Sequence, residues 1–121
     1  MSIALWCGVA LLGGVGATAR FLLDWFVSLR LGFRFPFGTM AVNLSGAFLL
    51  GLLAGAAVHG DARLLAGTAL LGSYTTFSTW MLETQRLGEE RRPGLAVANI
   101  GVSLFVGLAA VAIGHALGAQ L

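Results

Sequence analysis

A short stretch in the C-terminal half of the chain crowds polar groups into an otherwise apolar sequence. Residues 72–80 read GSYTTFSTW, and the hydroxyl side chains among them are Ser73, Tyr74, Thr75, Thr76, Ser78 and Thr79. In a bilayer core each hydroxyl must bond to its own helix backbone or serve another purpose. None of these side chains is charged, which argues against a proton relay or a carboxylate cation site. The stretch offers neutral hydrogen bonding beside aromatic rings.

Two further apolar segments carry polar groups at helical spacing. Thr39 and Asn43 are four residues apart, as are Asn99 and Ser103, so each pair shares a helix face. Either asparagine could simply bond a neighbouring helix. Polar groups at mid-depth in three segments favour a lined pathway over isolated interhelical bonds. Positive ring edges with N–H and O–H donors suit a small anion that has shed its water.

The elements that must position these groups are long and apolar. The chain is 58% hydrophobic and 10% charged, whereas a soluble domain carries about 25% charged residues. The composition therefore predicts an all-α, multi-pass protein of the cell membrane, with a single domain over residues 1–121 in contact with the lipid bilayer. Four segments approach the ~20 residues that a spanning helix needs: Ile3–Phe26, Phe37–His59, Leu64–Leu87 and Leu95–Leu117. Residues 29–38, 59–63 and 89–94 are the predicted connections.

Small residues within these segments indicate close helix packing. Gly51 and Gly55 form one GxxxG pattern, and Gly114 and Gly118 form another. Because glycine has no side chain, such a pattern lets two helix backbones approach each other in a membrane. Packing of the second segment, the fourth segment or both is therefore expected at these glycines.

The basic residues are distributed unequally between the two ends of the predicted bundle. All seven are arginines. Six belong to the side of the first and third connections, namely Arg20, Arg30, Arg34, Arg86, Arg91 and Arg92, and only Arg63 lies on the other side. The positive-inside rule then places these two connections in the cytoplasm and both termini outside. No aromatic-interleaved basic patch indicates nucleic-acid binding.

Signatures of enzymatic chemistry are missing from the sequence. There is no His, Glu and Cys pattern with metal-ligand spacing, no CxxC and no phosphate-binding glycine loop ahead of a helix. Cys7 is the single cysteine, so no internal disulfide can form. The apolar N-terminal segment lacks a preceding basic region, and we expect it to stay as a helix rather than to be cleaved as a signal peptide. We therefore do not expect an enzyme.

Three ordered motifs resemble those of the fluoride channels called Fluc or CrcB. They are GGVGATARF (13–21), PFGTMAVNLSGAFLLG (36–51) and GSYTTFSTWMLE (72–83). The resemblance spans essentially the whole chain. It implies a channel that lowers cytoplasmic fluoride by passive efflux. It also implies an antiparallel dimer of four-helix subunits, with the third helix broken at its middle and two pores formed between the subunits.

The same resemblance implies roles for individual residues. Backbone carbonyls matching Gly72 and Thr75 of both chains would hold a structural Na⁺ at the dimer interface. Asn43 would donate a hydrogen bond to fluoride from the second helix. Arg20 would lie near a vestibule and attract anions.

Further residues match the fluoride pathway of the family. Phe77 takes the first position of a phenylalanine pair. Ser78 and Thr79 match a polar track, with Ser103 expected to face them from the fourth helix. The sequence departs from the family pattern at two positions of this pathway. Trp80 stands in place of the second phenylalanine, and Asn99 in place of a tyrosine on the polar track.

These departures and the charge asymmetry leave alternatives open. An antiparallel homodimer needs one sequence inserted in both directions, whereas the arginine bias predicts insertion mainly in one. A heterodimer with a related, oppositely biased subunit is therefore as well supported as a homodimer. This chain could then be a non-conducting or half-channel subunit. A small multidrug-type exporter is less favoured, because residues Ile3–Ala19 contain no membrane carboxylate.

Overall fold

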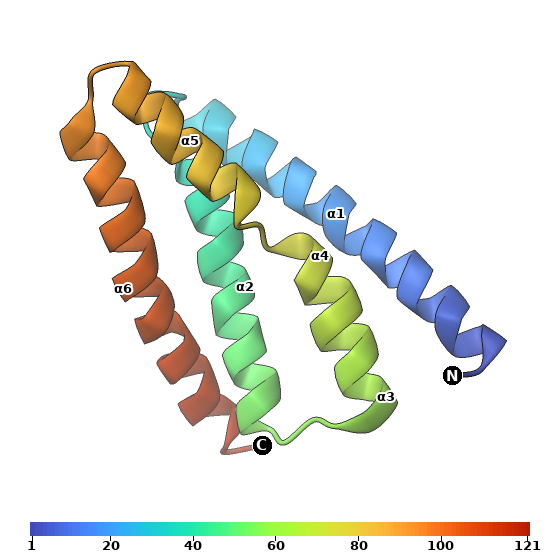
Figure 1. Ribbon diagram of the computed structural model, residues 1–121. Coiled ribbons are helices and arrows are strands. Elements are labelled where there is room, and N and C mark those ends of the chain that lie inside the picture. The colour runs from blue at the N-terminus through green and yellow to red at the C-terminus, as the bar shows by residue number, and fades with distance from the viewer.

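The computed structural model describes residues 1–121, and every regular element in it is helical. Figure 1 shows long helices side by side, with both termini at the same end of the bundle. The elements are α1 (Ile3–Leu31), α2 (Phe37–Gly55), α3 (Gly60–Arg63), η1 (Leu64–Leu71), α4 (Gly72–Tyr74), α5 (Ser78–Glu89) and α6 (Pro93–Gly118). The chain crosses the bundle four times, because α3, η1, α4 and α5 together form the third crossing (Figure 1).

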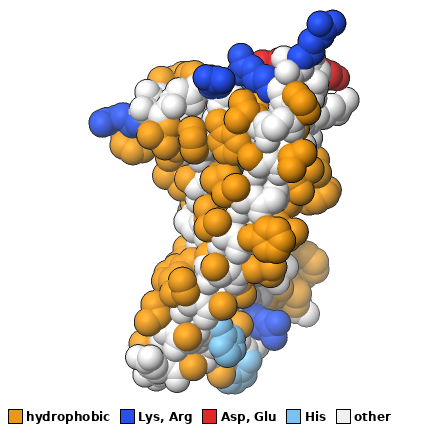
Figure 2. Space-filling view, turned by 90° about the vertical axis from the view of Figure 1, so that its left-hand side faces the viewer, with side chains coloured by type: hydrophobic (Ala, Val, Ile, Leu, Met, Phe, Trp, Pro, Cys, Tyr) orange, Lys and Arg blue, Asp and Glu red, His pale blue; other side chains and the backbone are white.

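Three of the four crossings are single helices long and apolar enough to span a membrane, namely α1, α2 and α6. Few apolar side chains are buried within the chain, and these are Val42, Ala69, Leu71 and Leu87. Figure 2 shows hydrophobic side chains along the length of the visible face, most basic side chains gathered at one end, and the histidines at the other end beside one further basic side chain. The protein is therefore a multi-pass membrane protein whose apolar exterior faces lipid or another membrane chain.

Several predicted boundaries differ from the observed ones. Helix α1 continues to Leu31 instead of ending near Phe26, because no glycine or proline occurs between Phe26 and Gly32, whose φ of 88° ends the helix. Helix α2 ends at Gly55, short of His59. The predicted turn at 59–63 is instead mostly the short helix α3.

The third crossing is interrupted at mid-depth, as the resemblance implied. After the short α3 the crossing is π-helical over η1, and it then passes through one α-helical turn that ends at Tyr74. Thr75 is extended, with φ −79° and ψ 159°, and α5 begins at Ser78. The interruption coincides with the run of hydroxyl residues, whose side chains compete with helix backbone bonds.

The two GxxxG patterns form one seam between α2 and α6. A Cβ atom on Gly114 would lie 3.0 Å from the Leu52 nitrogen and against the Phe48 carbonyl. One on Gly51 would lie 3.0 Å from the His115 nitrogen. Gly55 and Gly118 face the opposite backbone in the same way. The glycines therefore hold α2 and α6 backbone against backbone, as predicted.

We expect Gly114→Val to destabilise the subunit, because its side chain would collide with the α2 backbone and neither helix can yield locally. Overpacking of this kind typically costs about 1–3 kcal/mol. The midpoint of thermal unfolding in detergent measures the effect. Gly101→Val on the same helix is the matched control, since a Cβ there meets nothing within 4 Å. Equal midpoints for the two variants would contradict the seam.

Candidate functional site

The side chain of Asn43 occupies the interruption of the third crossing. Its Nδ2 donates to the Thr76 carbonyl at 2.8 Å, and its Oδ1 accepts from the Thr76 nitrogen at 2.9 Å. One amide thus replaces both backbone bonds that Thr76 would make in a continuous helix. The second N–H of the same amide group is left for another acceptor.

A groove of about 350 Å³ runs beside this amide, between α2, the interruption and α6. Its polar lining comes from Asn43, Thr75, Thr76, Trp80 and Ser103. The remaining lining residues are apolar or small: Ala47, Leu50, Phe77, Leu104, Gly107, Leu108 and Val111. No charged side chain lines the groove, so its polar chemistry is neutral hydrogen bonding.

The Oγ of Ser103 is the one buried side-chain polar atom in the protein without a hydrogen-bond partner. The residue is only 8% exposed and lines the groove with Asn43 and Trp80. A buried hydroxyl without a partner costs about 1–3 kcal/mol. Its Oγ–H is therefore available to a group that enters the groove.

Two aromatic side chains meet at the groove. The Phe77 and Trp80 rings make an edge-to-face contact, with centroids 5.9 Å apart and planes at 84°. Phe77 is 70% exposed. The indole N–H of Trp80 donates to the Asn99 carbonyl at 3.0 Å and is thus already bonded within the chain.

Asn99 lies in the contact between α5 and α6 and does not line the groove. It is 1% exposed, and its Nδ2 donates to Thr84 Oγ1 at 2.8 Å and to the Trp80 carbonyl at 3.4 Å. Thr84, which the sequence analysis did not single out, completes this network by donating to the Trp80 carbonyl at 2.8 Å. The spacing of four residues between Thr84 and Trp80, which places them on one helix face, could have identified Thr84 from the sequence.

The other residues assigned to the polar track lie elsewhere. Thr79 lines a second hollow of about 210 Å³ together with Arg20, Asp24, Thr39 and Thr76. Ser103 therefore does not face Thr79 within one chain. The hydroxyl of the exposed Ser78 lies 3.4 Å from that of Thr76.

This second hollow has a different electrostatic character from the groove. Arg20 and Asp24 are one helical turn apart on α1 and both line it. The buried Thr39 donates to the Glu83 carboxylate and thereby links α2 to α5. Sequence reasoning placed Thr39 on the Asn43 face but did not anticipate Glu83 as its partner.

Backbone carbonyls at the interruption remain free. Neither the Gly72 nor the Thr75 carbonyl has a hydrogen-bond partner among the neighbouring residues of the interruption. Gly72 is exposed, and a Cβ there would meet only the Gly67 oxygen at 3.7 Å. Hard cations prefer oxygen ligands, and free carbonyls within a membrane need a partner. The donor set therefore fits a small hard cation.

Comparisons with known proteins agree with the resemblance that the sequence motifs indicated. The family model described as CrcB-like protein, Camphor Resistance (CrcB), matches residues 7–115. The protein named fluoride-specific ion channel FluC 2 of Mycolicibacterium paratuberculosis is 60% identical over 120 residues, covering 99% of this chain and 98% of that one. Its namesake in Mycobacterium tuberculosis H37Rv is 58% identical over 115 residues (95% and 91%). The fluoride-specific ion channel FluC of Acidobacterium capsulatum is 43% identical over 122 residues (97% and 96%). Because the family model covers most of the sequence and these relatives align along nearly all of it, the chain belongs to the CrcB family.

Proposed function

We propose that this chain is a subunit of a fluoride-specific channel that lowers cytoplasmic fluoride by passive efflux. The names of the relatives support this proposal. The observation that carries it is the uncharged groove, in which the unpartnered Ser103 hydroxyl faces the same space as Asn43. Neutral donors can replace the water of a small anion without trapping it as a fixed cation would.

Residues on two faces of the subunit would contribute to the pathway. Asn43 and Ser103 donate to fluoride in the groove, and Phe77 supplies a ring edge. Thr79 and Ser78 lie outside this groove. They would therefore serve a pathway completed by a second chain, as in an antiparallel dimer with two pores.

Arg20 is the proposed vestibule residue. It lines the hollow that also contains Thr79, and it has no ion pair within 4 Å. An unpaired guanidinium at the edge of the membrane raises the local concentration of anions. The carboxylate of Asp24 in the same hollow offsets part of the positive potential of Arg20.

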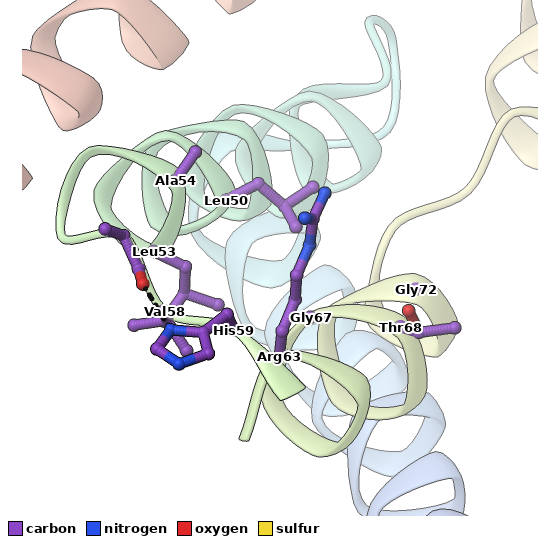
Figure 3. Close-up of a pocket in the computed structure, with 10 residues that line it drawn as sticks. Leu50, Leu53, Ala54, Val58, His59, Arg63, Gly67, Thr68 and Gly72 are labelled. Atoms are coloured by element: carbon purple, nitrogen blue, oxygen red, sulfur yellow. Dashed lines mark hydrogen bonds between the residues drawn. The ribbon is translucent and has the colours of Figure 1, made fainter. Parts of the chain in front are cut away.

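The face for the second chain is the one that carries Gly72. A groove of about 600 Å³ lies between the end of α2 and η1, with Gly67 and Gly72 on its wall. Figure 3 shows the Arg63 side chain extending along this groove toward Leu50. Small residues allow another helix to approach closely. The Gly72 and Thr75 carbonyls of two antiparallel chains would hold Na⁺ between the subunits, and the bound ion would supply positive charge near the pathway.

The partner could be a second copy or a related subunit. The arginine asymmetry favours one orientation in the membrane and therefore a partner of opposite bias. The numbering of some relatives as FluC 1 and FluC 2 is in keeping with paired genes. In such a heterodimer this chain could act as a half-channel. A multidrug-type exporter is disfavoured, because no carboxylate lines the groove.

Reconstitution of the purified chain alone in liposomes tests the function. A fluoride electrode should report rapid efflux, and the same vesicles should retain chloride. Fluoride efflux that appears only after a second family member is added would identify a heterodimer. Absence of fluoride efflux in both preparations, from protein that remains folded, would contradict the proposal.

We expect Ser103→Ala to slow fluoride efflux about tenfold or more, because a hydrogen bond to a charged partner contributes about 1.5–3 kcal/mol. The initial efflux rate at equal protein density measures this loss. Ser45→Ala is the matched control. It removes hydrogen bonds to the Val42 carbonyl and the Tyr74 hydroxyl, outside the groove, and should leave efflux near the parent rate. Parent-like efflux from Ser103→Ala would remove Ser103 from the pathway.

We expect Gly72→Val to weaken the dimer while the isolated subunit stays folded. Within one chain the added side chain meets almost nothing, but it would stand between the paired carbonyls. Light scattering in detergent, with and without Na⁺, measures the dimer fraction. Gly88→Val, on the exposed side of α5, is the control. A dimer of Gly72→Val with unchanged stability and Na⁺ dependence would argue against the carbonyl site.

A further inference from the structure

The geometry points to Asn99 as a positioning residue that, together with Thr84, holds the Trp80 indole with its N–H turned away from the fluoride pathway. This inference rests on the proposed function in taking the groove to be that pathway. It assigns no contact with fluoride to Asn99 itself. The question is whether the indole N–H of Trp80 is available to an ion in the groove.

The indole N–H has a fixed partner. It donates to the Asn99 backbone carbonyl at 3.0 Å, across the contact between α5 and α6. An indole has one donor and no acceptor, so nothing polar remains on the ring. The groove therefore meets carbon-bound hydrogen and π surface from Trp80, as it would from a phenylalanine.

The Asn99 side chain holds the two helices in this register. Its Nδ2 spans Thr84 Oγ1 and the Trp80 carbonyl, and Thr84 bonds to that same carbonyl. The asparagine is 1% exposed, so these bonds are made away from water. Each is costly to leave unmade in such surroundings. The closed network of Trp80, Asn99 and Thr84 consequently fixes both the ring and its acceptor.

The two positions at which the sequence departs from the family pattern thus contact each other. A tryptophan in the pathway would introduce an N–H that binds any anion, chloride included. The Asn99 side chain, bonded to Thr84 and to the Trp80 carbonyl, holds α5 and α6 in the register at which the backbone carbonyl of residue 99 accepts that N–H. We therefore expect Asn99 to preserve the preference for fluoride in the presence of Trp80, rather than to bind fluoride.

The first experiment compares Asn99→Leu with its parent in liposomes. We expect the ratio of fluoride to chloride efflux to fall about tenfold, the scale of one or two hydrogen bonds. Val97→Leu, an exposed change two residues away on α6, is the matched control and should keep the parent ratio. A parent-like ratio in Asn99→Leu would overturn the inference.

The second experiment asks whether Asn99 acts through the indole. In a Trp80→Phe background no N–H needs a partner, so Asn99→Leu should change the efflux ratio less than twofold, roughly the noise of one weak contact. An equal fall in both backgrounds would mean that Asn99 supports the fold only, and would overturn the positioning role.

A third measurement does not depend on transport. Replacing Trp6 and Trp25 by phenylalanine leaves Trp80 as the single fluorophore among the chain's three tryptophans. Asn99→Leu and, independently, the near-isosteric Thr84→Val should shift its emission and lower its anisotropy. Unchanged spectra in both variants would overturn the inference. A shift in a chain that conducts no fluoride, either alone or with a second family member, would contradict the proposed function while supporting the positioning of Trp80.

Discussion

The paired hydrogen bonds between the Asn43 amide and the Thr76 backbone are the interaction on which the rest of the site depends. A helix interrupted inside a membrane exposes backbone groups that water cannot satisfy. The amide replaces the two hydrogen bonds that Thr76 would otherwise lose, and so lowers the free-energy cost of the interruption. The Gly72 and Thr75 carbonyls stay free, and the aromatic side chains that follow turn toward α6. The groove and the proposed cation site both lie at the interruption that this side chain stabilises.

A side chain can reach the interruption only if its own helix is held in place. The glycine seam provides this, because α2 and α6 touch backbone against backbone over two turns. Gly46 extends the close packing on another side of α2, where a Cβ would collide with Thr75. The subunit therefore combines a rigid pair of helices with a third crossing that is discontinuous. This combination places Asn43 and Ser103 on fixed elements, while the backbone opposite them has an irregular path.

Charged side chains and the uncharged groove lie at different levels of the bundle. Most arginines lie at one end (Figure 2), and the groove at mid-depth has none. A pathway for a small anion needs attraction at its entrance and moderate binding within, since a charged group at the centre would retain the ion. The carboxylates Asp24 and Glu83 lie in or beside the Arg20 hollow, on the other side of the interruption from the groove. The two hollows thus differ in their charge, although Thr76 lines both.

The sequence by itself determined the four crossings, the glycine contacts and the polar residue types, because hydropathy, residue size and helical spacing are local properties. With the family motifs it also located the interruption. Tertiary structure decided the pairings: Asn43 with Thr76, Thr39 with Glu83, and Trp80 with Asn99. Within one chain it also places Thr79 and Ser103 beside different hollows. Such pairings depend on how each helix is rotated about its axis, and that rotation is set by packing between segments distant in sequence.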